Sequence, residues 1–393
     1  MAQKYTLKEV KTQKDVKEWL AYPSKLYKND PHYVRPMDED VEKLFDKNKN
    51  KLLRQGQCVR YTLLNEKTEI VGRIAAFIDP KMAKSNAQLT GGCGFFDCID
   101  DQEAANILFD AAVNWNKKNG MEAIDGPINF GDRDNFWGCL VEGFYDPIYY
   151  MPYNYSYYSQ LFENYGFKDY FKQLTYRREI GPGGLDPVIH AKAERLERNP
   201  DYTFEIINMK QIDKYAEYFM DIYNRAWAVI PGATKISKQH ATALLNQLKP
   251  IIDPRLMHFA FYKGEPIAFF LMMIDMNQIY KGLNGKSNWL NTLKIAYRVK
   301  IAHKANRVIS LAFGIVPEHQ GKGVDGGLII SFEKYALEKD FHYKELQLNW
   351  IGDFNPTMCK IAESIGGKIY KTHITYRYLF DREKPFERAK LQK

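Results

Sequence analysis

Cysteine is scarce in this 393-residue chain, and its five cysteines are scattered. No two of them form a CxxC pair and no HExxH motif occurs, so their spacing matches neither a disulfide framework nor a common metal site. The sequence therefore predicts reduced thiols and no bound metal. The cysteines are Cys58, Cys93, Cys98, Cys139 and Cys359.

Long apolar runs are also absent. Hydrophobic residues make up 45% of the chain and charged residues 26%, yet no stretch approaches the ~20 apolar residues that a membrane-spanning helix requires. Residues 1–20 are charged and amphipathic, and they lack the apolar core and cleavage site of a secretory signal. These absences argue against an integral membrane protein, and we expect a cytoplasmic location.

Acidic residues are missing from one segment. The chain has 56 Lys and Arg against 48 Asp and Glu, a net charge of +8, but no acidic residue lies between Asp275 and Glu318. Basic residues interleaved with apolar ones can lie on an anionic membrane, bind RNA or steer an anionic substrate. Because these cations turn to different faces at ~100° per residue, a solvated helix is the simplest interpretation, and peripheral membrane contact through residues 281–307 is an alternative. The cations are Lys281, Lys286, Lys294, Arg298, Lys300, Lys304 and Arg307.

Part of the chain is repeated at an offset of 200 residues. YYSQLFENYGFKDYFKQLTYRRE in the first half aligns with TMCKIAESIGGKIYKTHITYRYL in the second. A repeat this long is no solenoid unit and predicts two copies of one domain fold. The breaker sequence GPGG at 181–184 predicts the boundary, which gives domains at 1–181 and 182–393. The identical pairs are Gly166 and Gly366, Thr175 and Thr375, Tyr176 and Tyr376, and Arg177 and Arg377.

The order of predicted elements describes a mixed α/β fold. Each copy begins with antiparallel strands around a tight polar turn and continues with a strand, a turn, a helix and a further strand. That order predicts a mixed sheet with helices on both faces. In the second copy we expect strands at 202–207, 256–262, 266–275, 308–316, 345–350 and 372–379, and helices at 211–227, 238–248, 326–339 and 356–364.

A glycine-rich turn separates a β-branched strand from an apolar helix in ISLAFGIVPEHQGKGVDGGLIISFEKYAL. Gly321 and Gly323 allow a tight turn whose backbone N–H groups point toward one place, at the positive end of the following helix. Such a turn suits a pyrophosphate. A tight connection without any ligand would explain the same glycines.

The sequence VPEHQGKG at 316–323, in this order of elements, resembles the acyl-CoA-binding motif of the GNAT superfamily, the GCN5-related N-acetyltransferases. Asn355 and Pro356, followed by a helix that ends at Gly366, are similar to a later motif of that family. DPHYVRPM, VGRIAAFID and VEGFYDPI in the first half resemble two-domain bacterial GNAT-like proteins. The resemblance implies two GNAT-like domains in tandem. It also implies an N-acyltransferase that uses acetyl-CoA or a longer acyl-CoA and acylates a small-molecule or peptide amine.

The resemblance further implies where the donor and a general base would lie. The pantetheine arm would insert where the strand before the turn diverges from its neighbour, and the loop amides would hold the pyrophosphate. The implied donor-binding residues are Ile315, Val316, Gln320, Gly321, Lys322, Gly323, Val324 and Asn355. A base near the thioester would come from the strands beside that divergence or from the loop, and Asp353 or Glu318 would act as this base directly or through water. Asn349, at the end of the strand before Asp353, is a further candidate catalytic residue.

Two positions depart from the family pattern. Asp325 stands where the family usually has Gly or Ala, and its carboxylate could cap the helix and repel a phosphate. The tyrosine that many of these enzymes use as a general acid is replaced by Ala362 in the second copy and by Phe162 in the first. In addition, the first copy has carboxylates in place of the glycine-rich turn, so we expect no cofactor site there. These carboxylates are Asp97, Asp100, Asp101 and Glu103.

Two other functions stay open at this point. An aminoacyltransferase of the FemABX kind also pairs two GNAT-like domains, and it would bind aminoacyl-tRNA with an affinity that falls with salt. Outside that alternative, nucleic acid is not an expected partner. A binding protein without catalysis would follow if Asp325 closed the phosphate site. We expect the polar loop at 126–137 and the tyrosine-rich stretch at 145–158 to pack between the domains or to line an acceptor cleft.

Overall fold

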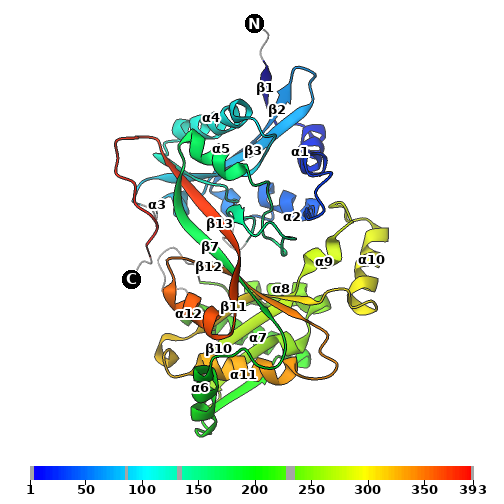
Figure 1. Cartoon of the computed structure of the whole chain (residues 1–393), viewed down its shortest axis with the longest axis vertical. Coiled ribbons are helices and arrows are strands. Elements are labelled where there is room, and N and C mark those ends of the chain that lie inside the picture. Colours follow the sequence, from blue (N-terminus) through cyan, green and yellow to red (C-terminus); the bar gives the residue numbers. More distant parts are fainter. Residues whose placement is uncertain (1–3, 85–86, 131–134, 227–234, 391–393) are drawn as a thin grey trace.

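The computed structural model of the protein describes residues 4–84, 87–130, 135–226 and 235–390, and its backbone is drawn in Figure 1. The strands of these residues form one mixed sheet of 13 strands. They are β1 (Tyr5–Glu9), β2 (Gln57–Asn65), β3 (Ile70–Ile78), β4 (Thr90–Cys98), β5 (Ala123–Gly126), β6 (Cys139–Glu142), β7 (Lys168–Glu179), β8 (Tyr202–Ile206), β9 (Met257–Tyr262), β10 (Glu265–Ile274), β11 (Arg307–Ile315), β12 (Glu345–Gly352) and β13 (Lys368–Leu379).

Helices flank this sheet. They are α1 (Gln13–Leu26), α2 (Asp38–Glu42), α3 (Pro80–Lys84), α4 (Gln102–Lys118), α5 (Tyr158–Tyr165), α6 (Pro187–Glu197), α7 (Ile212–Ala226), α8 (Lys238–Leu248), α9 (Met276–Tyr280), α10 (Trp289–Lys300), α11 (Val324–Ala336) and α12 (Pro356–Ser364). Within the described ranges, each helix is too short or too polar to span a bilayer.

The last strand of each repeat lies in the middle of the sheet. The strand order is β1-β2-β3-β4-β5-β13-β7-β12-β11-β10-β9-β8, and β6 pairs with β13 beside this path. The C-terminal strand β13 therefore lies between β5 and β7, and β7 pairs with β12 of the second half. Figure 1 shows β7 and β13 crossing the centre of the molecule. Residue 181, the predicted boundary, comes two residues after the end of β7, and the sheet continues across it.

The central strands relate the two repeats by a pseudo-twofold axis. β7 and β13 run antiparallel, with Arg177 opposite Lys368 and Lys168 opposite Arg377. Moving Arg177 forward and Lys368 back by the repeat offset gives Arg377 and Lys168, which is the second pair. The same offset that aligns the two sequences therefore also governs the backbone pairing at the centre.

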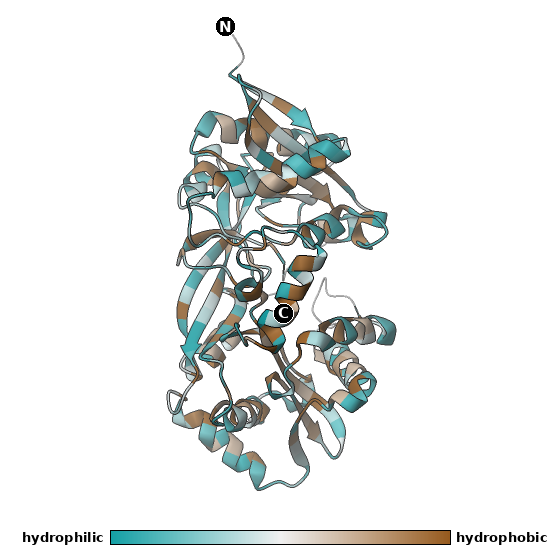
Figure 2. Cartoon of the chain, turned by 90° about the vertical axis from the view of Figure 1, so that its right-hand side faces the viewer, coloured by the Kyte–Doolittle hydropathy of each residue, from teal (hydrophilic) through white to brown (hydrophobic). Residues whose placement is uncertain are grey.

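Each half has a core to which the other half also contributes, Tyr376 of β13 to the first core and Ile148 to the second. In the first half, helices α4 and α5 cover β3, β4 and β5, with Phe109 and Phe162 fully buried. In the second half, α7 and α11 pack against β9, β10 and β11, where Phe259 and Phe269 are fully buried. Figure 2 shows the two halves with hydrophobic residues along the strands of both. The chain is thus two packed units joined by a shared sheet.

The elements expected for the second copy are present with small shifts. The helix expected at 326–339 is α11, and the one expected at 211–227 is α7, whose predicted last residue lies outside the described ones. Residues 131–134 of the predicted polar loop also lie outside them. Helix α6 was not predicted, although Asp186 caps it and Pro187 occupies its first turn, which is a common start signal.

Candidate active site

Strands β11 and β12 separate beside the second-half core. They are parallel partners at three positions only, from Arg307 opposite Glu345 to Ile309 opposite Gln347. β11 continues to Ile315 and β12 to Gly352 without further pairing between them. Central strands are usually buried, yet Leu311 is 39% exposed. We call residues 310–315 and 348–352 the β11–β12 splay.

The splay begins at a β-bulge. On β10, Leu271 lies opposite Ala312 and Met272 opposite Ser310, so Leu311 has no residue opposite it. A bulge bends its strand and leaves the extra residue outside the ladder. Across the splay, the N–H of Asn349 donates to Ser310 Oγ at 3.1 Å. Asn349 Oδ1 is buried and has no hydrogen-bond partner among the described residues.

The loop after β11 ends in a helix start that is not capped by any side chain in the described part of the chain. Gly321 and Gly323 adopt φ values of 71° and 96°, in the left-handed region. Gly323 is the N-cap residue of α11, and no side chain of the described residues hydrogen-bonds there. The first N–H groups of a helix need partners from outside the helix, and they attract anions. A Cβ on Gly321 would meet no atom of the described residues within 4 Å, so this turn borders open space among them.

Helix α6 brings two cations to this loop. Lys192 Nζ lies 2.5 Å from Asp325 Oδ2, and Arg195 Nη2 donates to the carbonyl oxygen of Lys322 at 2.7 Å. Asp325 therefore forms an ion pair with Lys192. It does not cap α11, which is the role that its position in the sequence suggested. Its negative charge is offset where a phosphate would approach. These contacts join segments that are far apart in the chain, so no local sequence pattern predicts them.

The other predicted donor-binding residues gather at the same end of β11. Val316 is buried, and its N–H donates to the carbonyl oxygen of Ile267 at 2.9 Å. Gln320 Nε2 donates to the carbonyl oxygen of Ile315 at 3.0 Å, which ties the loop to the strand. Val324 is buried at the start of α11. The contribution of these residues to donor binding stays a prediction.

Asn355 and Asp353 follow β12 and make structural contacts. Asn355 caps α12 by accepting from the N–H of Met358 at 3.3 Å. Asp353 Oδ1 accepts from the N–H of Lys172 at 3.1 Å, and its Oδ2 lies 2.8 Å from Arg388 Nη2. Both carboxylate oxygens of Asp353 are thus engaged, and its service as a base stays a prediction.

Glu318 lies on the loop surface with its side chain 64% exposed, 3.6 Å from Arg225 Nη2. A hydrogen bond from its own backbone N–H and the charge of Arg225 lower the pKa of this carboxyl. A lowered pKa weakens a carboxylate as a proton acceptor. His319 beside it hydrogen-bonds Tyr202 at 3.0 Å, which fastens the loop to β8.

Two bacterial proteins resemble this chain over nearly its whole length. Protein YghO of Escherichia coli (strain K12) is 26% identical over 369 residues, which cover 92% of each chain. Bacterial ceramide synthase of Caulobacter vibrioides is 25% identical over 373 residues, which cover 93% of this chain and 95% of that protein. No protein-family model matches the chain.

Among solved structures, a tandem GNAT protein from the clavulanic acid biosynthesis pathway matches both halves. Its TM-score is 0.53 at 11% identity, and the match covers 95% of this chain and 98% of that one. The chain has the tandem GNAT fold. The predicted mixed α/β architecture is thereby confirmed, and β1 to β7 and β8 to β13 are called the first and second GNAT repeats below.

The central strands of the tandem GNAT fold carry a polar face that sequence reasoning missed. Its members are opposed in the register, with Lys371 opposite Thr175, His373 opposite Gln173, and Gln347 opposite Arg177. The alternation in QLTYRRE and KTHITYRYL was the available signal, because side chains of a strand point to opposite faces in turn. We call the six residues just named, together with Asn349, the central polar face.

Several atoms of the central polar face are buried without partners among the described residues. They are Thr175 Oγ1, Gln347 Oε1, Asn349 Oδ1 and His373 Nδ1. Burial lowers the pKa of His373 to about 3, so its ring is neutral. Its Nε2–H donates to the carbonyl oxygen of Pro152 at 3.2 Å. Buried polar atoms usually bind protein or water, so this group of atoms marks a place for water or a polar substrate.

Lys371 is the one lysine of the central polar face as defined above, and it is almost fully buried. The residue is 1% exposed, and its Nζ donates to the carbonyl oxygen of Asp146 at 2.5 Å. Burial, aided by the charge of Arg307, lowers the pKa of Lys371 to about 7. At neutral pH this amine is therefore partly unprotonated, which lets it accept a proton.

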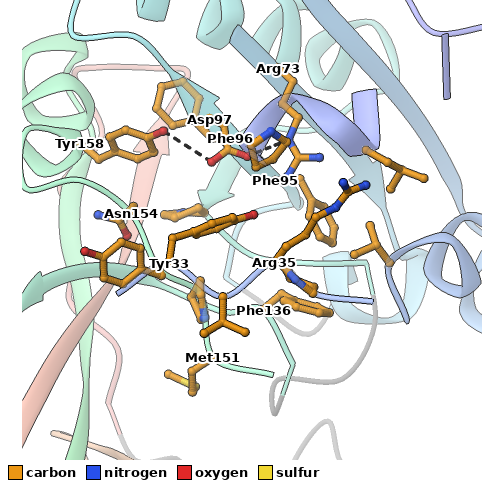
Figure 3. Close-up of a pocket in the computed structure, with 18 of the residues that line it drawn as sticks. Tyr33, Arg35, Arg73, Phe95, Phe96, Asp97, Phe136, Met151, Asn154 and Tyr158 are labelled. Carbon is orange, nitrogen blue, oxygen red and sulfur yellow. Dashed lines mark hydrogen bonds and ion pairs between the residues drawn. The ribbon is translucent and has the colours of Figure 1, made fainter. Parts of the chain in front are cut away.

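A cavity of about 90 Å³ lies in the first GNAT repeat (Figure 3). Apolar and aromatic side chains line most of it, and the buried pair of Arg73 Nε and Asp97 Oδ2 closes one side at 2.7 Å. Gly138 and Pro152 also line it. A Cβ on Gly138 would meet Gln173 Oε1 at 2.2 Å, and Pro152 bonds His373, so the cavity borders the central polar face.

Three aromatic residues near this cavity hold strained backbones. Phe95, Phe136 and Tyr150 have φ values of 49°, 51° and 66°. Their rings form a row. The ring centroids of Phe95 and Phe136 are 5.6 Å apart, and those of Phe136 and Tyr150 are 5.7 Å apart. Bulky residues rarely adopt positive φ, and such strain gathers at binding sites.

The corresponding helix start in the first repeat is closed. Asp101 caps α4 by accepting from the N–H of Ala104 at 3.0 Å, and Lys4 Nζ lies 2.9 Å from the same carboxylate. A carboxylate at this place satisfies the helix and repels a phosphate. Among the described residues no His, Cys, Asp and Glu side chains converge in a group that could hold a metal ion.

Proposed function

We propose that the protein is an N-acyltransferase that takes an acyl group from a coenzyme A thioester and passes it to an amine. The proposal rests on two neighbouring features. The second half of β11 no longer pairs with β12, and no side chain of the described residues caps the start of α11. A strand with an unpaired edge offers backbone groups to an extended ligand. An uncapped helix start binds phosphate groups.

The residues present fit such a donor. The main-chain N–H groups from Gly321 to Val324 would hold the pyrophosphate, and Arg195 and Lys322 would add positive charge. Since Lys192 pairs with Asp325 at 2.5 Å, that carboxylate is compatible with an anion at the loop. The apolar side chains along the exposed half of β11, beginning at Leu311, would contact the acyl chain.

The transfer forms one N–C bond and breaks one C–S bond. An amine is protonated at neutral pH, so a base must first take one proton from the ammonium group and release it to solvent. The nitrogen lone pair then attacks the thioester carbonyl carbon, and the thiolate leaves. The second proton of the nitrogen passes to this thiolate, which gives an amide and a thiol.

We assign the first proton transfer to Lys371. Its pKa of about 7 suits a base at neutral pH, and it lies opposite Thr175, which is next to β12 on the central polar face. Ordered water at the unpartnered oxygens of Thr175 and Asn349 would carry the proton. Asp353 and Glu318 are the alternatives, acting directly or through water, and Asn349 would orient the amine.

For the acceptor we propose an amine on a long apolar chain. Bacterial ceramide synthase, 25% identical to this chain, bears a name that implies such chemistry, because a ceramide is the amide of a long-chain amino alcohol. The cavity of the first repeat supports this class, since its walls are mostly apolar and it borders the central polar face. At about 90 Å³ the cavity would take only the first carbons of the apolar tail, next to the amine that reaches the polar groups.

Two measurements test the proposal. Thermal unfolding with coenzyme A, acetyl-CoA or palmitoyl-CoA reports donor binding, since a ligand at ~100 times its Kd stabilises by ~2.7 kcal/mol. Mass spectrometry of a mixture with palmitoyl-CoA and sphinganine reports the amide. We expect stabilisation by all three nucleotides and an N-acyl product.

Each contrary outcome has a distinct meaning. No stabilisation by any nucleotide would exclude the acyl-CoA proposal and favour a binding protein. Stabilisation by aminoacyl-tRNA alone, lost at high salt, would favour the aminoacyltransferase. Stabilisation without product from sphinganine would exclude only the long-chain acceptor, and a panel of short amines would then identify the class.

A further inference from the structure

Helix α10 presents an apolar face to solvent. Its large apolar residues, together with Ile301 directly after its last residue, are among the most exposed of the described residues, with Trp289 70% and Ile301 68% exposed. At ~100° per residue, the five residues of this face span about 120° of the helix circumference. We call them the α10 apolar face, and they are Trp289, Leu290, Leu293, Tyr297 and Ile301.

The opposite side of α10 is fixed to the protein. Asn291 is buried, and Ile295 and Val299 pack against the core of the second repeat. Just before the helix, Ser287 Oγ donates to Glu39 Oε1 of the first repeat at 2.5 Å. The helix is therefore held by both repeats, and its apolar face is directed away from them. Figure 2 is turned so that the side that carries α10 in Figure 1 faces the viewer.

Unpaired positive charge surrounds this face. Of the seven cations between Asp275 and Glu318, Lys281 pairs with Asp146 and Arg307 with Asp275, while Arg298 bonds backbone carbonyl oxygens. The remaining four are exposed and form no ion pair with a described residue. They are Lys286, Lys294, Lys300 and Lys304. Exposed lysines beside an apolar stripe, with no acidic residue in the segment, complement an anionic surface.

We propose that α10 docks the protein on an anionic membrane surface, with its apolar face between the lipid headgroups and its lysines on the phosphates. Helices that lie in a membrane interface place Trp and Leu among the lipid headgroups. At ~100° per residue, Lys300 falls within the arc of the α10 apolar face and Lys294 just beside it, so both would reach the lipid phosphates. RNA binding would use stacking and charge, and it would leave Leu293 and Ile301 without a role. The inference goes beyond acyl transfer and does not depend on it.

Vesicle co-sedimentation tests the proposal. We expect the wild-type protein to sediment with vesicles of phosphatidylglycerol and phosphatidylcholine in equal parts, and far less with phosphatidylcholine alone. The triple variant W289A/L293A/I301A should lose ~100-fold in partitioning to the mixed vesicles. The control L244A/L337A removes two leucines, 37% and 49% exposed, from α8 and from the end of α11, and it should sediment like the wild type.

Charge and insertion are then measured separately. The variant K294Q/K300Q should lose ~30-fold on the mixed vesicles and little on phosphatidylcholine. Trp289 is the most exposed tryptophan among the described residues, so its fluorescence should shift to the blue on the mixed vesicles. This shift should vanish in W289F.

The proposal is overturned if the triple variant sediments as well as the wild type, or if neither sediments. It is also overturned if RNA competes fully for the same lysines without vesicle binding, or if the triple substitution dissociates a dimer in light scattering. Stabilisation of the triple variant by coenzyme A is measured without vesicles. Failure of docking and failure of acyl-CoA binding are therefore distinguishable.

Discussion

The two GNAT repeats begin their equivalent helices in different ways. In the first repeat the side chain of Asp101 accepts from the first turn of α4, whereas in the second Gly323 starts α11 and no side chain caps it. An N-cap carboxylate satisfies the helix from within the chain. An uncapped start leaves the same N–H groups for a ligand. The helix start thus stabilises the fold in the first repeat, and in the second repeat the equivalent helix start suits anion binding.

A second contrast lies on the central strands. Phe171 and Lys371 are equivalent by the offset of 200, and both are buried. Phe171 contacts the rings of Trp350 and Phe354 and contributes to packing. Lys371 sits on the central polar face with a lowered pKa. Burying an amine costs free energy that burying a phenylalanine does not cost. The difference between these two equivalent positions therefore supports a catalytic role for Lys371.

The largest effect is expected from Lys371→Met. It keeps the side-chain length and removes the base, so kcat should fall ~1000-fold while coenzyme A affinity by calorimetry is unchanged. In the wild type kcat/KM should rise with pH through about 7, as Lys371 loses its proton. D353N and E318Q are the matched controls. A larger loss in either of them, with K371M active, would move the base to that residue.

The same lysine predicts a pH dependence of stability. Because burial lowers its pKa from 10.5 to about 7, the unfolded chain binds more protons between these values. The free energy of unfolding of the wild type should therefore rise with pH across this window. The variant K371M should lack that rise, and parallel curves for the two proteins would contradict the lowered pKa.

Converting the second helix start toward the first should abolish donor binding. Gly323→Asp places a carboxylate at the start of α11, and coenzyme A affinity should fall at least ~100-fold. Gly323→Asn has the same size, and both residues tolerate the left-handed conformation, so it serves as the neutral control with a smaller loss. Calorimetry measures both. Equal losses would mean that shape, and not charge, is decisive.

The pair of Lys192 and Asp325 offers a smaller effect. Lys192→Gln leaves the Asp325 carboxylate without its cation beside the loop, so coenzyme A should bind ~10-fold more weakly. The double variant K192Q/D325N should recover most of this affinity. Lys4→Gln, which removes a cation from the first-repeat helix start, is the control and should change nothing. Unchanged affinity in K192Q would show that Asp325 does not face the donor.

The smallest effect concerns the closed helix start. Asp101→Ala removes the N-cap of α4 and should lower the free energy of unfolding by ~1 kcal/mol. Its coenzyme A affinity should equal that of the wild type. Thermal unfolding with and without the nucleotide measures both quantities. A gain in nucleotide binding would reveal a second donor site in the first repeat.

Much of the fold was predictable because turn and strand signals are local and because the two halves of the sequence repeat. The glycine turn of the second repeat and the offset that pairs Thr175 with Thr375 led to a tandem GNAT architecture. The site was less predictable. Asp353 looked like a base at the end of a strand, but Arg388 and the backbone of Lys172 hold its carboxylate. Contacts between residues far apart in the chain leave no mark in either segment.

The sequence by itself determined the repeat, the mixed sheet and the place of the glycine turn, since turn chemistry and side-chain alternation act between near neighbours. Only the tertiary structure decided that the last strands of both repeats meet at the centre and that Lys192 pairs with Asp325. It also decided that Lys371 is buried next to unpartnered polar atoms. Burial and the pKa of a side chain depend on what packs around it, and packing joins residues that the sequence keeps apart.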